Sequence, residues 1–168
     1  MKLKAIIALA FGFLLAADAL KADASSVPEG DQHVALLAQQ LNDLESASNL
    51  FQRCINQDRP IVEAVNALNV LADNIDRMCA HLLQFCVWVK TENASGKLQF
   101  ELSPAGREQL HDLSIRTNTV FQDEMKEFAD TLEQKPQYAR DPAIQAVGQR
   151  ILASLNTLQI FKDRAGKQ

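Results

Sequence analysis

One segment of the chain, residues 61–89, repeats apolar side chains at a spacing that a long helix satisfies. The apolar positions recur in alternating steps of four and three residues, the period of a helix that buries one narrow stripe. A strand would instead alternate at every second residue. The stripe consists of Ile61, Val65, Leu68, Ala72, Ile75, Cys79, Leu82, Cys86 and Val89. The segment therefore predicts a long amphipathic helix that crosses its neighbours at a shallow angle.

Three further segments have helical periodicity and residues typical of helix ends. The first runs from about residue 32 to residue 56, with Asp31 placed to cap it, and Asp58 is placed to cap the helix that follows. A Ser-Pro pair opens the segment 103–135 and an Asp-Pro pair opens the segment 141–166, each giving a capping side chain and a first-turn proline. We therefore expect four helices.

Four amphipathic helices with mostly short connections predict an all-α fold, an antiparallel up-down-up-down four-helix bundle. In a hairpin that turns near residues 58–59, residue i should face roughly residue 117 − i. The longest connection, residues 92–102, loses the helical period and alternates apolar with polar residues. We expect a short extended segment there, between the second and third helices. A β-hairpin of residues 87–91 with residues 97–102 is the alternative.

The first 24 residues have the pattern of a cleavable secretory signal peptide. A start with two lysines precedes an uninterrupted apolar run, residues 5–17, and Ala-x-Ala spacing places the cleavage after Ala19 or Ala24. A membrane anchor is the alternative, but the run is shorter than the roughly 20 residues that a span needs. We expect a signal peptide, residues 1–24, and a single helical domain, residues 25–168. The mature protein should be periplasmic or secreted and should not span a membrane.

The composition is that of an ordinary globular domain, with 47% hydrophobic and 23% charged residues. The whole chain has 17 basic and 21 acidic residues, and the net charge without residues 1–24 is about −5. The chain has no basic stripe, so we expect no binding to nucleic acid.

Three cysteines are an odd number for an exported chain. Cys79 and Cys86 are seven residues apart on one predicted helix, a rise of about 10.5 Å that exceeds the reach of a disulfide. In the hairpin register above, Cys54 lies far from Cys79. We expect three small buried side chains; a disulfide between subunits or a reactive thiol is the alternative.

The predicted inward stripes carry almost no polar residues, which indicates a dry interior. The exceptions are Ser48, Thr117 and Glu124, and His81 lies two residues after Cys79, off the stripe. Histidine, methionine or carboxylate ligands facing inward would be needed for a haem or a di-metal centre. We therefore predict no cofactor.

Other polar residues give no enzyme chemistry either. Glu108 and His111 have the Glu-x-x-His spacing of metal-binding bundles, but Leu110 between them is the core position, so both lean outward. A site for an anionic substrate would need inward arginines, and those on the four helices all lie off the stripes: Arg53, Arg77, Arg116 and Arg150. We predict no catalytic residue, no metal site and no enzyme.

The end of the second predicted helix, residues 81–89, is apolar nearly all round. Such a helix must be covered on every side. Cover by Leu98, Phe100 and Leu102 folding back is one explanation; a surface for a partner is the other. The residues predicted to bind a partner are Leu83, Phe85, Val87, Trp88 and Phe100.

These features favour an exported, non-catalytic helical bundle that acts through protein–protein contact, as an inhibitor, immunity protein, adaptor or chaperone does. The partner would be another protein or a second copy of the chain. The alternative is a carrier that holds a lipid or another small apolar ligand inside the bundle.

Overall fold

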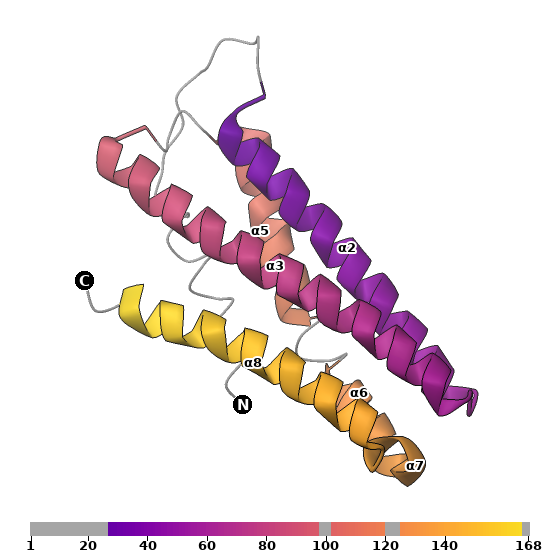
Figure 1. The fold of residues 1–168 in the computed structure, drawn as a ribbon. Coiled ribbons are helices and arrows are strands. Elements are labelled where there is room, and N and C mark those ends of the chain that lie inside the picture. Colours follow the sequence, from indigo (N-terminus) through magenta and orange to yellow (C-terminus); the bar gives the residue numbers. More distant parts are fainter. Residues whose placement is uncertain (1–26, 98–101, 120–124, 166–168) are drawn as a thin grey trace.

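The computed structural model describes residues 27–97, 102–119 and 125–165, with the side chains of residues 27–97, 102–117 and 130–157. Within these ranges the chain forms helices and no strand, which confirms the predicted all-α class (Figure 1). The helices are α2 (Glu29–Asn56), α3 (Ile61–Ser95), α5 (Pro104–Thr119), α6 (Met125–Gln134), α7 (Pro136–Ala139) and α8 (Pro142–Ala165).

Helices α2 and α3 form a long antiparallel hairpin (Figure 1). Midway along it, the side-chain amide of Asn74 donates to the backbone carbonyl of Asp43 at 3.3 Å. This pairing agrees with the register expected from the position of the turn. At the turn itself Asp58 has a positive φ of 51°, a conformation that Asp tolerates better than most residues.

Helix α8 packs against α3, and α5 packs against α2 (Figure 1). Within each pair the two helices run parallel to each other. Arg150 on α8 forms ion pairs with Asp73 and Asp76 on α3, and Arg116 on α5 forms one with Glu45 on α2 at 3.0 Å. The structure therefore supports the all-α class, and these two contacts join parallel rather than antiparallel helices.

The predicted caps of the last two helical segments are confirmed. The hydroxyl of Ser103 accepts from the backbone N–H of Gly106 at 3.0 Å at the start of α5. The carboxylate of Asp141 accepts from the N–H groups of Ala143 and Ile144 at 2.9 and 3.1 Å at the start of α8. In both cases a proline follows the capping residue. Proline has no N–H, so it leaves no backbone donor unsatisfied in the first turn.

The predicted caps of the first two helices are wrong. Helix α2 begins earlier than expected, after Pro28, so that Asp31 lies inside it and instead accepts from the backbone N–H of Ser103 at 3.0 Å. Helix α3 begins after Pro60 without a side-chain cap, and Asp58 instead accepts from Nζ of Lys135 at 2.6 Å. Both aspartates thus join distant parts of the chain.

Helix α3 extends through Ser95, so residues 87–91 are helical and the alternative β-hairpin is wrong. The helix ends where Gly96 takes a φ of 74°, which lets the N–H of Lys97 reach the carbonyl of Glu92 at 3.0 Å. The polar residues before this glycine end the apolar period without ending the helix. Residues 98–101 of the expected extended segment lie outside the described residues.

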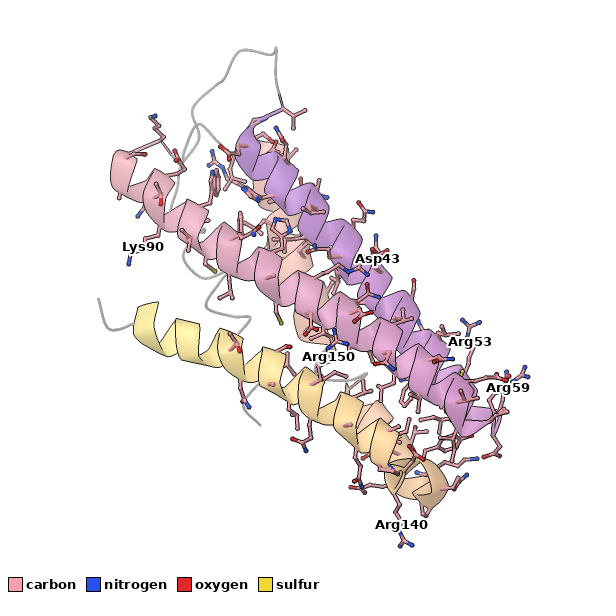
Figure 2. The ribbon with its side chains drawn as sticks, in the orientation of Figure 1. Asp43, Arg53, Arg59, Lys90, Arg140 and Arg150 are labelled. Atoms are coloured by element: carbon pink, nitrogen blue, oxygen red, sulfur yellow. The ribbon has the colours of Figure 1, made fainter. Side chains whose placement is uncertain are left out.

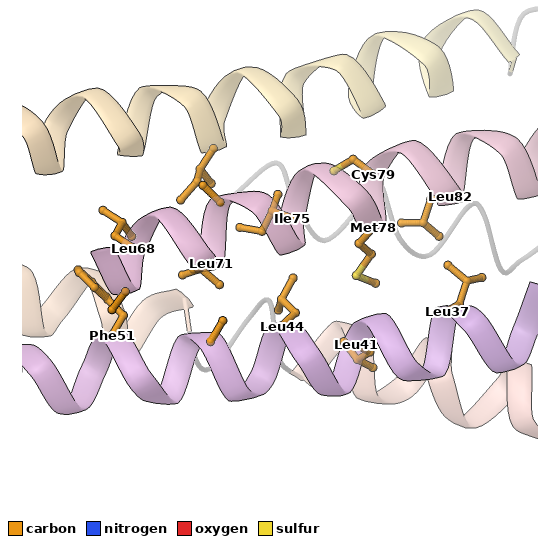
Figure 3. Packing of buried hydrophobic residues seen from close by; sticks show 14 of the residues in the cluster. Leu37, Leu41, Leu44, Phe51, Leu68, Leu71, Ile75, Met78, Cys79 and Leu82 are labelled. Carbon is orange, nitrogen blue, oxygen red and sulfur yellow. The ribbon is translucent and has the colours of Figure 1, made fainter. Parts of the chain in front are cut away.

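The core lies between α2 and α3 (Figure 3). It also includes buried residues of α5, α7 and α8. Most of the predicted stripe on α3 is buried, but its first residue, Ile61, is exposed because the helix begins there. Ser48 and Thr117 are buried as expected, and Glu124 lies outside the described residues. The largest fully buried side chains are Phe51, Phe85, Leu37, Leu41, Ile55, Leu68, Leu71, Ile75, Val34 and Thr117.

Candidate functional site

Two histidines meet inside the end of the hairpin that lies away from its turn. Nδ1 of His33 on α2 is 3.0 Å from Nε2 of His81 on α3. The other ring nitrogen of His81, Nδ1, is 3.2 Å from the amide oxygen of Gln40 on α2. His81 is only 5% exposed. We call His33 and His81 the histidine pair, and this part of the hairpin the histidine end.

The amide oxygen of Gln40 sets the proton positions in the neutral pair. An amide oxygen only accepts, so Nδ1 of His81 carries the proton that it donates. Nε2 of the neutral His81 ring then has a free lone pair and accepts from Nδ1–H of His33. The three side chains form one chain of donors and acceptors across the two helices.

Aromatic rings surround the His33 side of the pair. The ring centroid of His33 lies 5.2 Å from that of Trp88 and 5.8 Å from that of Phe85. Phe85 and Trp88 stack on each other, with an angle of 16° between their planes. Nε1 of Trp88 is buried without a hydrogen-bond partner among the described residues. The pair therefore lies in a largely apolar environment.

This environment shifts the titration of His81. Burial lowers the pKa of His81, and the neighbouring ring of His33 lowers it further. The two causes act in the same direction, because a low-dielectric site and a nearby positive charge each disfavour the charged imidazolium. His81 thus stays neutral at a pH at which an exposed histidine begins to take up a proton.

The prediction that His81 lies off the buried surface is wrong, and Asn74 on the same helix is also buried. The cause is the width of the buried surface: α3 is covered by α2 on one side and α8 on another. Asn74, His81 and Trp88 recur every seven residues and form a second row beside the apolar stripe. The seven-residue spacing was the sequence signal for this second buried row. It was missed because Asn74 and His81 are polar.

The residues predicted to bind a partner do not share one surface. Phe85 is buried and, with Trp88, lies on the α2 side of α3. Leu83 lies seven residues after Asp76, whose contacts are with α8, and Val87 follows one turn later. Val87 is 53% exposed and Leu83 is half-buried. Phe100 is outside the described residues.

The residues expected to cover this end are described in part. Leu102 is buried in the core, and Leu98 and Phe100 lie outside the described residues. Val87 keeps its exposure with Leu102 in place.

The remaining polar candidates lie where the sequence predicts. Glu108 and His111 are exposed, and so are the four arginines that we expected off the stripes. At the turn, Arg53 and Arg59 point away from the helices (Figure 2). Among the described residues no three or more His, Cys, Asp or Glu side chains form a group that could hold a metal ion. In the same ranges no helix has the length and apolarity to cross a bilayer.

The three cysteines are free thiols. Cys79 is buried, and Cys54 and Cys86 are half-buried. Burial, with a smaller contribution from the negative charge of Asp76, raises the pKa of Cys79 to about 12. Burial also raises the pKa of Cys86. Both thiols keep their protons at neutral pH and are therefore poor nucleophiles.

The chain matches no protein-family model, and no curated protein or solved structure is detectably similar to it. What the chain does is therefore inferred from its own residues.

Proposed function

We propose that this chain is exported and acts by binding another protein, in the manner of an inhibitor, immunity protein, adaptor or chaperone, rather than by catalysis. The supporting observation is the exposure of Val87, with half-buried Leu83 one turn before it, near the end of α3. Both side chains lie on the same face of α3 as Asp76, which contacts α8.

The energetic argument concerns this edge as a unit. A single exposed valine is common on protein surfaces and by itself indicates nothing. Val87 and Leu83 lie one turn apart on one face of α3, so a partner could cover both side chains together. Burying a fully exposed valine side chain contributes about 1.5–3 kcal/mol, so covering the exposed half of Val87 would contribute about 1 kcal/mol to a larger interface.

The arrangement that we propose for the whole domain is the antiparallel four-helix bundle. Helices α5 and α6 together take the place of its third helix, beside α2, and α8 is its fourth. Successive long helices then alternate in direction along the chain, as they do for α2 and α3 (Figure 1).

Export is proposed from residues 1–24, which lie outside the described residues. The test is to express the full chain with its own N-terminus and to measure the mass of the product in each cell fraction. We expect the periplasmic or secreted product to begin at residue 20 or residue 25. A full-length product confined to the cytoplasm would contradict export.

Partner binding is tested with Val87→Lys and the matched variant Val62→Lys. Val62 is on the same helix and 65% exposed, but it lies at the opposite end. We expect Val87→Lys to weaken partner binding or self-association by at least about tenfold, equivalent to about 1.4 kcal/mol. The reason is that a charge would replace apolar surface that the partner covers in the complex. Val62→Lys should have no effect.

A photo-crosslinking amino acid at position 87 or position 62 identifies the partner in the producing cell, and sedimentation velocity measures self-association. Loss of binding in both lysine variants, or in neither, would contradict the proposal. A stoichiometric lipid in an organic extract of the purified protein would favour the carrier alternative instead.

A further inference from the structure

We infer that the histidine pair makes the packing of α2 on α3 sensitive to pH, so that the histidine end is closed near neutral pH and loosens in acid. This inference does not depend on the partner-binding proposal. It is drawn from the hydrogen-bond geometry of His33, His81 and Gln40.

The geometry accommodates one added proton but not two. If His81 takes up a proton, both its N–H groups donate, one to Gln40 and one to Nδ1 of His33, which must then be the unprotonated nitrogen of a neutral ring. If both rings are protonated, two N–H donors face each other at the 3.0 Å separation of Nδ1 and Nε2. The second proton therefore replaces a hydrogen bond with repulsion between two positive charges.

The charged groups on the neighbouring turns have other partners. On α2, Asp31 accepts from the backbone of Ser103. On α3, Arg77 bonds to Asn74 and to the carbonyl of Asp73. On α5, Arg107 donates to the carbonyl of Leu102. The other titratable groups of these turns are Glu29, which has a partner of its own, the exposed Glu108, His111 and Asp112, and the thiols of Cys79 and Cys86, which keep their protons at neutral pH.

Burial is the main influence on the pKa of His81 and the charge of His33 is the second, and both lower it. A histidine with a lowered pKa in the folded state stabilises the fold above its unfolded pKa of about 6.5. This stability is lost as the pH falls from that value towards the folded pKa, because the unfolded chain binds the proton more readily. For one proton, the unfolding equilibrium constant rises by at most about tenfold per pH unit.

The effect should be local to one end of the hairpin. The whole chain contains three histidines. Two form the pair and the third, His111, is exposed on α5. The seam near the turn, residues 47–55, contains none. Asp31, two residues before His33, holds the start of α5 through Ser103, so loosening α2 here also affects that contact.

Tryptophan fluorescence can detect the loosening, because Trp88 is the single tryptophan of the chain and lies beside His33. Loosening of this end would separate the indole from His33 and expose it to water, so we expect the emission of the full chain to change as the pH falls from about 8 to about 5. His33→Gln should abolish the change, and the matched variant His111→Gln should preserve it.

Hydrogen exchange of the wild-type chain gives a test that needs no variant. After correction for the intrinsic pH dependence of exchange, the amides of residues 33–40 should exchange faster at pH 5 than at pH 7.5, by up to about thirtyfold for one proton, and those of residues 47–55 should not. The inference would be overturned by fluorescence emission that does not change across this pH range, or that changes in the same way in His33→Gln. Hydrogen exchange that rises equally in both segments would also overturn it.

Discussion

The two ends of the α2–α3 hairpin differ in the polar contacts that accompany their buried apolar side chains. At the turn, Phe51 and Ile55 are fully buried apolar side chains. A hydrogen bond of 2.5 Å from the hydroxyl of Tyr138 to the carbonyl of Arg59 closes that end over α7. Burial raises the pKa of Tyr138, so this donor keeps its proton at neutral pH. At the histidine end, the buried apolar side chains Val34, Leu37 and Phe85 are accompanied by a hydrogen bond between two titratable rings.

The difference shows what each kind of closure depends on. Apolar contacts are not directional and do not titrate between about pH 5 and 8. A buried hydrogen bond contributes a net of about 0.5–1.5 kcal/mol, but leaving one partner unsatisfied costs about 1–3 kcal/mol. The contacts described at the turn end therefore do not titrate between about pH 5 and 8, whereas we expect those at the histidine end to depend on protonation.

The largest effect should come from emptying the apolar seam near the turn. Phe51 is 0% exposed, so Phe51→Ala should lower the free energy of unfolding by about 3–5 kcal/mol by losing buried surface and leaving a cavity. The neighbouring, exposed Leu50 provides the control, and Leu50→Ala should cost less than about 1 kcal/mol. Urea unfolding measures both. Equal costs would show that the turn end is not held by its apolar seam.

A smaller effect tests the polar contacts beside the histidine pair. A Cβ at Gly106 would lie 1.9 Å from Oδ1 of Asp31, so Gly106→Ala should displace that carboxylate from Ser103 and cost about 1 kcal/mol. In an Asp31→Ala background the same change should be neutral or stabilise by about 0.5–1 kcal/mol, because alanine favours a helix over glycine. Urea unfolding of the four proteins measures this cycle. The same cost in both backgrounds would contradict the contact.

The smallest effect should come from the exposed ion pair at the turn. Asp58→Asn removes the charge that Lys135 contacts at 2.6 Å and keeps a residue type that tolerates the positive φ. Because exposed pairs contribute little, the loss should be about 0–1 kcal/mol and should disappear in about 1 M salt. A larger loss that persists in salt would mean that polar contacts also control the turn end.

The sequence by itself determined the helical class, the hairpin register and the caps of α5 and α8. These features depend on local rules: the period of apolar residues along one helix, the site of a turn, and a capping side chain followed by proline. The same rules placed Glu108, His111 and the arginines outside the core.

Only the tertiary structure decided which residues beside the stripe are buried, and so formed the histidine pair. His33 and His81 are 48 residues apart, and the burial of His81 depends on how widely α2 and α8 cover α3. Periodicity gives the centre of a buried surface but not its width, because the width is set by neighbouring helices that are distant in sequence. For the same reason, the sequence did not show that Leu83 and Val87 lie on a different face of α3 from Phe85 and Trp88. That difference depends on which neighbouring helix covers each face.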